Sequence, residues 1–364
     1  MTEPAGRLPG ELVDVRESQR FDADSLDRYM AAHVDGYHGP LKVQQFEGGQ
    51  SNPTFAALTP GRNYVIRKKP PGKLEKSAHA VEREYRIITA LQSSGVPVPR
   101  TFALCEDNSV IGTPFFVMEA VQGRIFRNPA MPEVAAPEER REMYSDMVRV
   151  LARLHRIDWN AAGLADYGKP ANYMGRQVAL WKDQYTRTKT HDIESMDRLM
   201  AWFPDHLPKD DWTTIMHGDY RLDNVVFHPV EPKIVAVLDW ELSTLGHPLV
   251  DLTANTMLYY VPNNPMAGKM GGQSGLMGVK FAELGIPTEA EYIGLYAWEM
   301  GLEAIPDYRY FMAFGMFRGA AIIQGIVRRH LDGNASSSRA AMFGPAVRLL
   351  ADLAYRQVAD RIGN

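Results

Sequence analysis

Short apolar runs separated by turn residues fill the first third of the chain. The runs cover 41–46, 54–58 and 64–67, and the two turns between them are rich in Gly, Pro and Asn. Runs of this length joined by such turns indicate antiparallel strands. The pattern therefore predicts a meander of three strands, which the Pro-Pro-Gly sequence at 70–72 brings to an end.

The pattern changes to helical spacing at 80–91, where the apolar side chains are Val81, Tyr85, Ile88 and Leu91. Two further strand-like runs follow at 101–104 and 115–118. We therefore expect residues 36–120 to form a small antiparallel sheet with one inserted helix. Residues 1–35 are expected to be a lead-in, irregular and polar up to about residue 20, with a short helix that begins near Asp24.

Beyond Glu133 the apolar positions follow helical spacing almost throughout. The predicted helices cover 141–154, 175–188, 193–203, 292–304, a segment from residue 310, and 345–361. Three short strands, 214–216, 225–227 and 234–238, interrupt them and carry His, Asp or Asn at their ends. Residues 121–364 should therefore form a second, larger and mainly helical lobe, so the predicted fold class is α+β with two lobes.

One of these helices is apolar enough to raise the question of a membrane span. Residues 310–327 are mostly apolar, but Arg318 and Gln324 interrupt them. A spanning helix needs about 20 residues that are mostly uncharged, and apolar side chains all around an axis are also typical of a buried helix. We therefore predict a core helix here and no membrane partner.

Composition narrows the class of protein further. The 364 residues include 40 Lys and Arg and 44 Asp and Glu, which gives a formal net charge of −4, and 45% are hydrophobic. The balance of charge provides no basic surface for nucleic acid, so no nucleic-acid partner is expected. Cys105 is the one cysteine, which excludes an intrachain disulfide and a Cys-rich zinc site. The polar start lacks the apolar stretch of a signal peptide, and a cytoplasmic location is expected.

The chemistry is concentrated in the sequence His-Gly-Asp-Tyr-Arg-Leu-Asp-Asn at 217–224. The catalytic loop of protein kinases, H-R-D-L-x-x-x-N, has His, Asp and Asn at the same offsets. In such a loop the Asp accepts the proton of the attacking hydroxyl and the Asn holds Mg²⁺. Asp239 ends the apolar strand of the next hairpin, where a kinase places its second Mg²⁺ ligand. The spacing therefore predicts phosphoryl transfer, with Asp219 as the base and Asn224 and Asp239 as metal ligands.

These motifs resemble the aminoglycoside phosphotransferase-like superfamily of small-molecule kinases, which includes the choline-kinase type. Its catalytic loop is H-G-D-x-x-x-x-N, followed by an Ile/Leu-Asp-Trp/Phe-Glu sequence. The resemblance covers about 40–360 and is nearest to the kinase-like domain fused to some acyl-CoA dehydrogenases. The segments that carry it are FEGGQSNPTF, YVIRKKPPGKLEKSAHAVEREYRI, HGDYRLDNVVFHP and LDWELSTLGHPLVDL.

The resemblance implies a protein-kinase-like fold that uses ATP and Mg²⁺. It implies that Glu84, on the helix of the sheet lobe, pairs with a strand cation. The family has Lys in that position, whereas this chain has Arg67, with Lys68 beside it. Arg221 matches the place where serine/threonine protein kinases put a lysine near the γ-phosphate.

Further positions carry over from the same resemblance. The turn that includes Ser51 and Asn52 would cover the nucleotide, and backbone groups of Glu119 and Ala120 would bind adenine at the hinge between the lobes. His217 is expected to bond the loop backbone, and Asp251 to brace the same loop. His155 is expected to pack at the end of a helix.

The function that follows is an ATP-dependent phosphotransferase, a small-molecule kinase with a hydroxyl group as acceptor. The resemblance to the nearest branch favours a hydroxy fatty acid or a hydroxyacyl-CoA as the acceptor, and the apolar character of 257–277 would suit an acyl group. The same resemblance suggests a functional link to an acyl-CoA dehydrogenase. Two alternatives stay open: an aminoglycoside O-phosphotransferase, and a kinase-like module that binds nucleotide without catalysis, for which the Arg67 substitution is the one supporting feature.

Overall fold

The computed structural model describes residues 8–47, 52–70, 80–264, 274–333 and 343–362. Within it the chain divides into two compact units. The first comprises Met1–Phe126, Asn160–Leu164 and Leu222–Ser243, and the second comprises Arg127–Trp159, Ala165–Arg221 and Thr244–Asn364. Residues 121–126, 160–164 and 222–243, which the sequence pattern places in the larger lobe, are thus grouped with the first unit.

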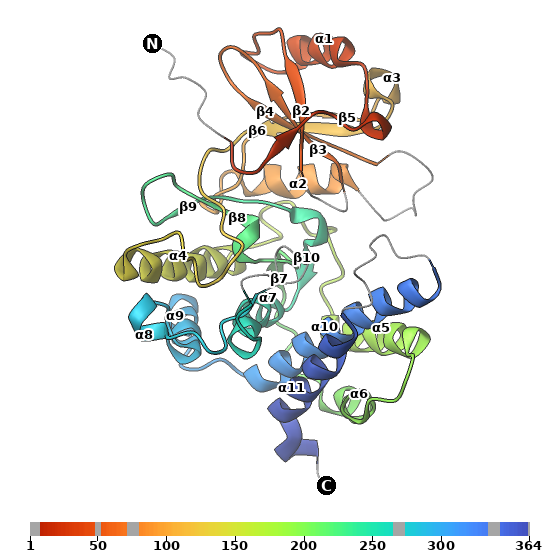
Figure 1. Cartoon of the computed structure of the whole chain (residues 1–364), viewed down its shortest axis with the longest axis vertical. Helices are drawn as coiled ribbons and strands as arrows, with labels where there is room; N and C mark the ends of the chain where they lie inside the picture. Colours follow the sequence, from red (N-terminus) through yellow and green to blue (C-terminus); the bar gives the residue numbers. More distant parts are fainter. Residues whose placement is uncertain (1–7, 48–51, 71–79, 265–273, 334–342, 363–364) are drawn as a thin grey trace. The chain divides into compact units, whose positions relative to one another are not determined.

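The first unit is built on an antiparallel sheet whose described strands run in the order β1-β2-β3-β4-β6-β5 (Figure 1). The strands are β1 (Leu12–Val13), β2 (Lys42–Phe46), β3 (Thr54–Leu58), β4 (Tyr64–Lys68), β5 (Thr101–Cys105) and β6 (Phe115–Glu119). The meander and the two later strands that the apolar runs predict are thus confirmed, each to within one residue at either end.

Each face of this sheet is covered by helix. On one face, α1 (Ala23–His33) and α3 (Asn108–Ile111) pack over a core that includes Phe55, Ile66 and Phe115 (Figure 1). On the other face lies α2 (Val81–Leu91), whose Tyr85 ring meets Phe116 at 6.0 Å between ring centroids. Successive side chains of a strand point to opposite faces. Arg67 and Lys68, neighbours on β4, therefore lie on different sides of the sheet.

The lead-in is more ordered than its polar sequence predicts. Leu12 and Val13 pair with Phe46 and Gln45 of β2 and extend the sheet by an edge strand. A 3-10 turn, η1 (Glu17–Gln19), follows it. The expectation of an irregular segment up to residue 20 is therefore wrong for this part, because pairing with β2 supplies the order that two apolar residues alone could not signal.

The segment 222–243 joins the first unit as a small hairpin. It contains η3 (Leu222–Asn224), β8 (Val225–Phe227), β9 (Ile234–Val237) and η4 (Trp240–Leu242). The amide of Arg124 donates to the carbonyl of Phe227 at 2.8 Å, and the amide of Val237 donates to the carbonyl of Pro97 at 2.8 Å. These bonds hold the hairpin against the residues that connect the sheet to the rest of the chain.

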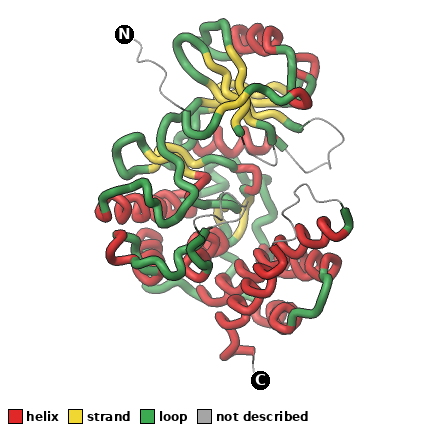
Figure 2. The backbone as a smooth tube through the Cα atoms, in the orientation of Figure 1, coloured by secondary structure: helices red, strands yellow, loops and turns green. Residues whose placement is uncertain are grey.

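The second unit is mainly helical (Figure 2). Within it α10 contacts α5, α7 and α11, whereas α4 packs against α9, and β7 (Thr214–Met216) pairs antiparallel with β10 (Thr244–Gly246). The described helices are α4 (Pro137–His155), α5 (Tyr173–Thr188), α6 (Glu194–Trp202), α7 (Pro248–Thr256), α8 (Phe281–Leu284), α9 (Glu289–Met300), α10 (Tyr308–Leu331) and α11 (Gly344–Ile362), with 3-10 turns η2 (Phe203–His206) and η5 (Met257–Tyr260).

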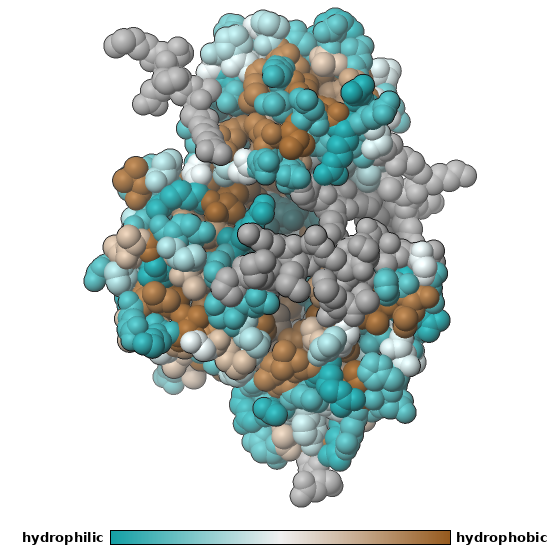
Figure 3. Space-filling model, viewed as in Figure 1, coloured by the Kyte–Doolittle hydropathy of each residue, from teal (hydrophilic) through white to brown (hydrophobic). Residues whose placement is uncertain are grey.

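By length and composition alone, α10 is the one helix in the described part of the chain that could cross a membrane. Its most apolar 18-residue window is 61% buried inside the fold, with Phe311, Phe314 and Phe317 among the buried side chains. This agrees with the prediction of a core helix. On the face drawn in Figure 3, apolar side chains of the second unit form small groups bordered by hydrophilic ones.

Candidate active site

Arg67 is the centre of a charged cluster in the first unit. Its Nε lies 2.9 Å from Oε2 of Glu84, so the predicted pair is present. Its Nη2 lies 2.7 Å from Oδ1 of Asp239 and 3.1 Å from Oε2 of Glu241. One guanidinium thus lies within ion-pair distance of three carboxylates, an arrangement that suits its planar fork of N–H donors.

The backbone explains why these side chains converge. Arg67 is on the face of β4 that α2 covers, and α2 carries Glu84. Asp239 follows β9 with φ +65° and ψ 58°, a left-handed conformation that Asp adopts more readily than most residues. The chain turns sharply there into η4, and the carboxylates of Asp239 and Glu241 both reach Nη2 of Arg67.

Burial and charge set the protonation of this cluster. Burial alone would lower the pKa of Arg67, but the carboxylates of Glu84, Asp239 and Glu241 outweigh it and raise that pKa, so the guanidinium stays charged. Burial also raises the pKa of Glu84 to about 7, although Arg67 pulls it down. With three carboxylates around one cation, the most deeply buried of them is the one that most readily keeps a proton.

Asn224, the other predicted metal ligand, is close to Asp239 along the hairpin. The amide of Leu238 donates to the carbonyl of Asn224 at 2.8 Å, which places the start of β8 beside the end of β9. Among the described residues, no group of three or more His, Cys, Asp or Glu side chains is arranged to hold a metal ion. Mg²⁺, however, is usually bound through one or two carboxylates together with substrate phosphates, and a carboxylate with an amide oxygen fits that chemistry.

Asn52 joins the same cluster, whereas Ser51 lies outside the described residues. The side-chain amide of Asn52 donates to Oε2 of Glu241 at 3.4 Å, and the residue is 4% exposed. Lys68 has a different place: its Nζ donates to Oε1 of Gln19 at 3.2 Å, and burial lowers its pKa. Of the two adjacent cations, Arg67 is therefore the one in the candidate site.

At the end of β6 the structure separates the two predicted hinge residues. The backbone amide of Glu119 donates to the carbonyl of Arg100 at 2.8 Å, and its carboxylate accepts from the amide of Arg100 at 3.2 Å. The Glu119 amide is therefore committed within the first unit. Ala120 follows directly and leaves the strand.

The remaining predicted residues, Asp219 and Arg221, belong to the loop after β7 in the second unit. Nε of Arg221 lies 3.2 Å from Oδ1 of Asp219, and both side chains are 31% exposed. Gly218, just before Asp219, has φ +83°, a conformation that favours glycine. This backbone requirement accounts for Gly at a position where protein kinases have Arg.

A buried carboxylate braces this loop, as predicted for Asp251. Its Oδ2 accepts from the amide of His217 at 2.7 Å and its Oδ1 from the amide of Gly218 at 2.8 Å. His217 in turn accepts the amide of Asp219 on its Nδ1 at 3.2 Å. Burial would raise the pKa of Asp251, but His155, His217 and the Gly218 amide outweigh it and lower that pKa, so the carboxylate is ionised.

Two contacts of this region were not predicted. Nε2 of His155 lies 3.3 Å from Oδ2 of Asp251, and Nδ1 of His155 lies 2.7 Å from the hydroxyl of Tyr296. His155 therefore does more than pack at the end of its helix. Tyr296 is 141 residues away in the sequence and stands in an ordinary helical pattern, so no local signal singles it out.

Comparison with known proteins decides the family. The sequence profile of the phosphotransferase enzyme family matches residues 42–274, a range that includes all the site residues that the sequence predicts. This chain belongs to the phosphotransferase enzyme family.

Relatives agree with this assignment. The phosphotransferase is 43% identical to acyl-CoA dehydrogenase family member 10 of Mus musculus over 94% of its own length, and 40% identical to acyl-CoA dehydrogenase family member 11 of Homo sapiens over 96%. It spans only 31% of the mouse protein and 45% of the human one. The resemblance to a kinase-like domain carried by acyl-CoA dehydrogenase relatives is thereby confirmed.

Solved structures confirm the fold. A candidate aminoglycoside phosphotransferase from Ralstonia eutropha JMP134 is 45% identical, with a TM-score of 0.85 over 94% of this chain and 99% of that one. A thermostable mutant of aminoglycoside phosphotransferase APH(4)-Ia, solved with AMP-PNP and hygromycin B, has a TM-score of 0.58 at 15% identity over 92% and 99% of the two chains. The predicted kinase-like α+β fold and the phosphotransferase class with a hydroxyl acceptor therefore both hold.

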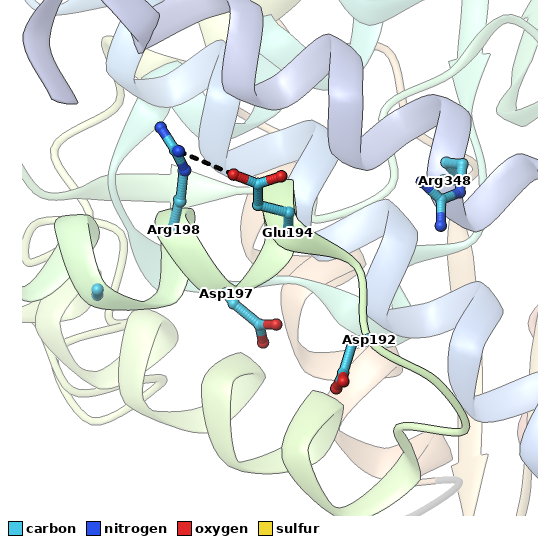
Figure 4. A pocket seen from close by; sticks show the side chains of 6 residues that line it. Asp192, Glu194, Asp197, Arg198 and Arg348 are labelled. Atoms are coloured by element: carbon cyan, nitrogen blue, oxygen red, sulfur yellow. Dashed lines mark ion pairs between the residues drawn. The ribbon is translucent and has the colours of Figure 1, made fainter. Parts of the chain in front are cut away.

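The second unit of the phosphotransferase also has a pocket beside α6 and α11, away from the catalytic loop in the sequence (Figure 4). Arg198 pairs with Glu194 at 2.8 Å, while Lys189 lies 2.9 Å from both Asp192 and Asp197. The acidic side chains there are thus neutralised by neighbouring cations. We assign this pocket no part in phosphoryl transfer.

Proposed function

We propose that this phosphotransferase moves the γ-phosphate of ATP to the hydroxyl of an acyl-bearing small molecule, a hydroxy fatty acid or a hydroxyacyl-CoA. The observation that carries the reaction is the braced loop that presents Asp219, together with the Arg67 cluster that includes Asp239. The acceptor class is supported by the acyl-CoA dehydrogenase relatives, which match 94% and 96% of this chain.

Asp219 would act as the base. Its carboxylate takes the proton of the acceptor hydroxyl while that oxygen bonds to the γ-phosphorus, the bond from the γ-phosphorus to the bridging oxygen breaks, and ADP leaves. Asn224 and Asp239 would hold Mg²⁺, which when bound neutralises charge on the phosphate oxygens. Arg221 is the second cation proposed to face the transferred phosphate.

Residues of the first unit are proposed to bind the nucleotide. Arg67 is proposed to contact the phosphates through Nη2 while its Nε stays paired with Glu84, since the two contacts involve different nitrogens of the guanidinium. Asn52 and the adjoining Ser51 would cover the phosphates. Because Arg100 already takes the Glu119 amide, the proposed contact of that residue with adenine is through its carbonyl, with the Ala120 amide beside it.

Two substitutions separate the proposed roles. Asp219→Asn should abolish transfer and leave the Kd for MgATP nearly unchanged, whereas Asp239→Asn should weaken both. The matched control is Asp223→Asn, the same change four residues further along the chain, which should keep turnover. Equal loss of MgATP binding in Asp219→Asn and Asp239→Asn, measured by calorimetry, would contradict the division of roles.

The acceptor is tested by mass spectrometry. Wild type and Asp219→Asn are each incubated with MgATP and a panel of hydroxyacyl-CoAs, hydroxy fatty acids and aminoglycosides. A phosphorylated hydroxyacyl species formed only by the wild type supports the proposal. A phosphorylated aminoglycoside would replace it with the antibiotic-modifying alternative. ATP binding without phosphorylation of any acceptor would favour the non-catalytic module.

A further inference from the structure

A line of buried polar groups runs from α9 through the end of α4 to α7 in the second unit. Tyr296 lies on α9, His155 is the last residue of α4, and Asp251 lies on α7 (Figure 1). The Tyr296 hydroxyl and the His155 ring are in contact at 2.7 Å, and the ring and Asp251 at 3.3 Å. The Tyr296 residue and the His155 side chain are 0% exposed and the Asp251 side chain 1%, so water does not compete for these bonds.

Asp251 and Tyr296, the two outer groups of this line, determine which atom donates in each hydrogen bond to His155. The ionised carboxylate of Asp251 accepts two backbone amides of the loop and can only accept from His155 as well, so Nε2 of His155 must carry a hydrogen. Nδ1 of a neutral imidazole is then an acceptor. A tyrosine hydroxyl can donate to it, and burial keeps the phenol protonated by raising the pKa of Tyr296 well above its usual value.

We propose that Tyr296 is a positioning residue for Asp219: its hydroxyl holds His155 as the neutral Nε2–H tautomer, and that tautomer orients Asp251 toward the amides of His217 and Gly218. The effect reaches the base through the loop backbone, because the Asp219 amide is bonded to His217. This inference rests on the proposed role of Asp219.

The same helix provides a matched control. Tyr292 lies one turn before Tyr296 on α9, is 2% exposed, and its hydroxyl has no hydrogen-bond partner among the described residues. Tyr292→Phe and Tyr296→Phe remove the same atom from the same helix at similar depth. Only the second removes the donor to His155.

The first readout is the tautomer itself. In protein labelled with ¹⁵N-histidine, His155 is assigned as the signal lost in His155→Gln, and its two ring nitrogens report which one carries the hydrogen. We expect the Nε2–H form in wild type and Tyr292→Phe, and a mixture of forms in Tyr296→Phe. An Nδ1–H form or a doubly protonated ring in wild type would overturn the proposal, even if Tyr296→Phe failed to fold.

The second readout is turnover. Losing one buried hydrogen bond should lower kcat of Tyr296→Phe about fivefold to tenfold, with KM for ATP unchanged, because the loop and not the nucleotide site is affected. Tyr292→Phe should keep the wild-type kcat. In the His155→Gln background, Tyr296→Phe should have no further effect. A tautomer shift with unchanged kcat would overturn the link to Asp219, whereas absence of transfer in the wild type would count against the proposed function and leave the tautomer result standing.

Discussion

Replacing Arg67 by Met should destabilise the first unit in a manner that depends on pH. The substitution keeps a side chain of similar length but removes the guanidinium, whose Nε is paired with Glu84 and whose Nη2 is paired with Asp239 and Glu241. Asp239 and Glu241 have side chains 36% and 24% exposed and can turn to water. Glu84 is 1% exposed, so it would be left as a buried charge without a neighbouring cation.

The magnitude follows from Glu84. Breaking a buried ion pair on one side costs about 3–5 kcal/mol when the remaining charge stays ionised. Glu84 can avoid this by keeping a proton, since its pKa in the folded protein is already about 7 and Arg67 is the group that lowers it. We therefore expect Arg67→Met to cost about 3 kcal/mol or more at pH 8, and about 1 kcal/mol at pH 5, where Glu84 is protonated with or without Arg67.

Proton linkage predicts the same direction for the dependence of stability on pH. A carboxyl whose pKa is raised on folding binds more protons in the folded than in the unfolded state, so its contribution to stability is full below about pH 4.5 and is lost as the pH rises through 7. Arg67→Met raises the Glu84 pKa further and so steepens this loss. Glu84→Gln in the same protein should restore much of the stability at pH 8, because a neutral amide carries no buried charge.

Hydrogen exchange at the amides of α2 measures the effect locally, since a chain of two units need not unfold in a single step. Exchange should speed up in Arg67→Met at pH 8, after correction for intrinsic rates, and much less at pH 5. An equal loss of protection at both pH values, or no recovery in the double substitution with Glu84→Gln, would refute the assignment of the cost to an unpaired Glu84.

Three other predictions concern substitutions of single residues. Gly218→Ala should cost about 1 kcal/mol, because φ is +83° there, and should lower kcat with the Kd for MgATP unchanged, as kinetics and calorimetry would show. Asp251→Asn should cost about 1.5–3 kcal/mol through weaker bonds to the buried amide of His217 and the partly buried amide of Gly218, seen as faster hydrogen exchange at 217–218. Burial lowers the pKa of His247, so below about pH 6.5 the unfolded chain binds more protons at this residue than the folded one, and stability should fall on acidification. His247→Asn can keep the cap on the Leu249 amide and should lose less Tm between pH 7.5 and 5.5 than wild type.

Much of the first unit could be predicted because its signals are local. Alternating apolar runs and turn residues located β2, β3 and β4 to within one residue, and helical spacing located α2 equally well. The edge strand β1 has two residues and no period of its own. Its order comes from pairing with β2, more than thirty residues away, which no local pattern encodes.

The candidate site also contains residues with a local sequence signal and partners without one. Asp219, Asn224 and Asp239 could be proposed as site residues because phosphoryl-transfer chemistry fixes the spacing of such residues after short strands. The contacts between Arg67 and both Asp239 and Glu241 join positions 172 and 174 residues apart, and Tyr296 reaches His155 across 141. These partners depend on how helices and hairpins pack, and a single sequence carries no record of that.

Arginine at position 67 takes on a different meaning once its partners are known. As a departure from lysine, it was the one feature that favoured a module without catalysis. In the structure Nε of Arg67 pairs with Glu84, as the lysine of the family is expected to do, while Nη2 pairs with Asp239 and Glu241. We expect those carboxylates to be able to exchange Nη2 for a metal and phosphates without breaking the Glu84 ion pair, because a different nitrogen of the guanidinium lies next to Glu84. The substitution is thus accounted for by the carboxylates around it, and it gives no reason to doubt turnover.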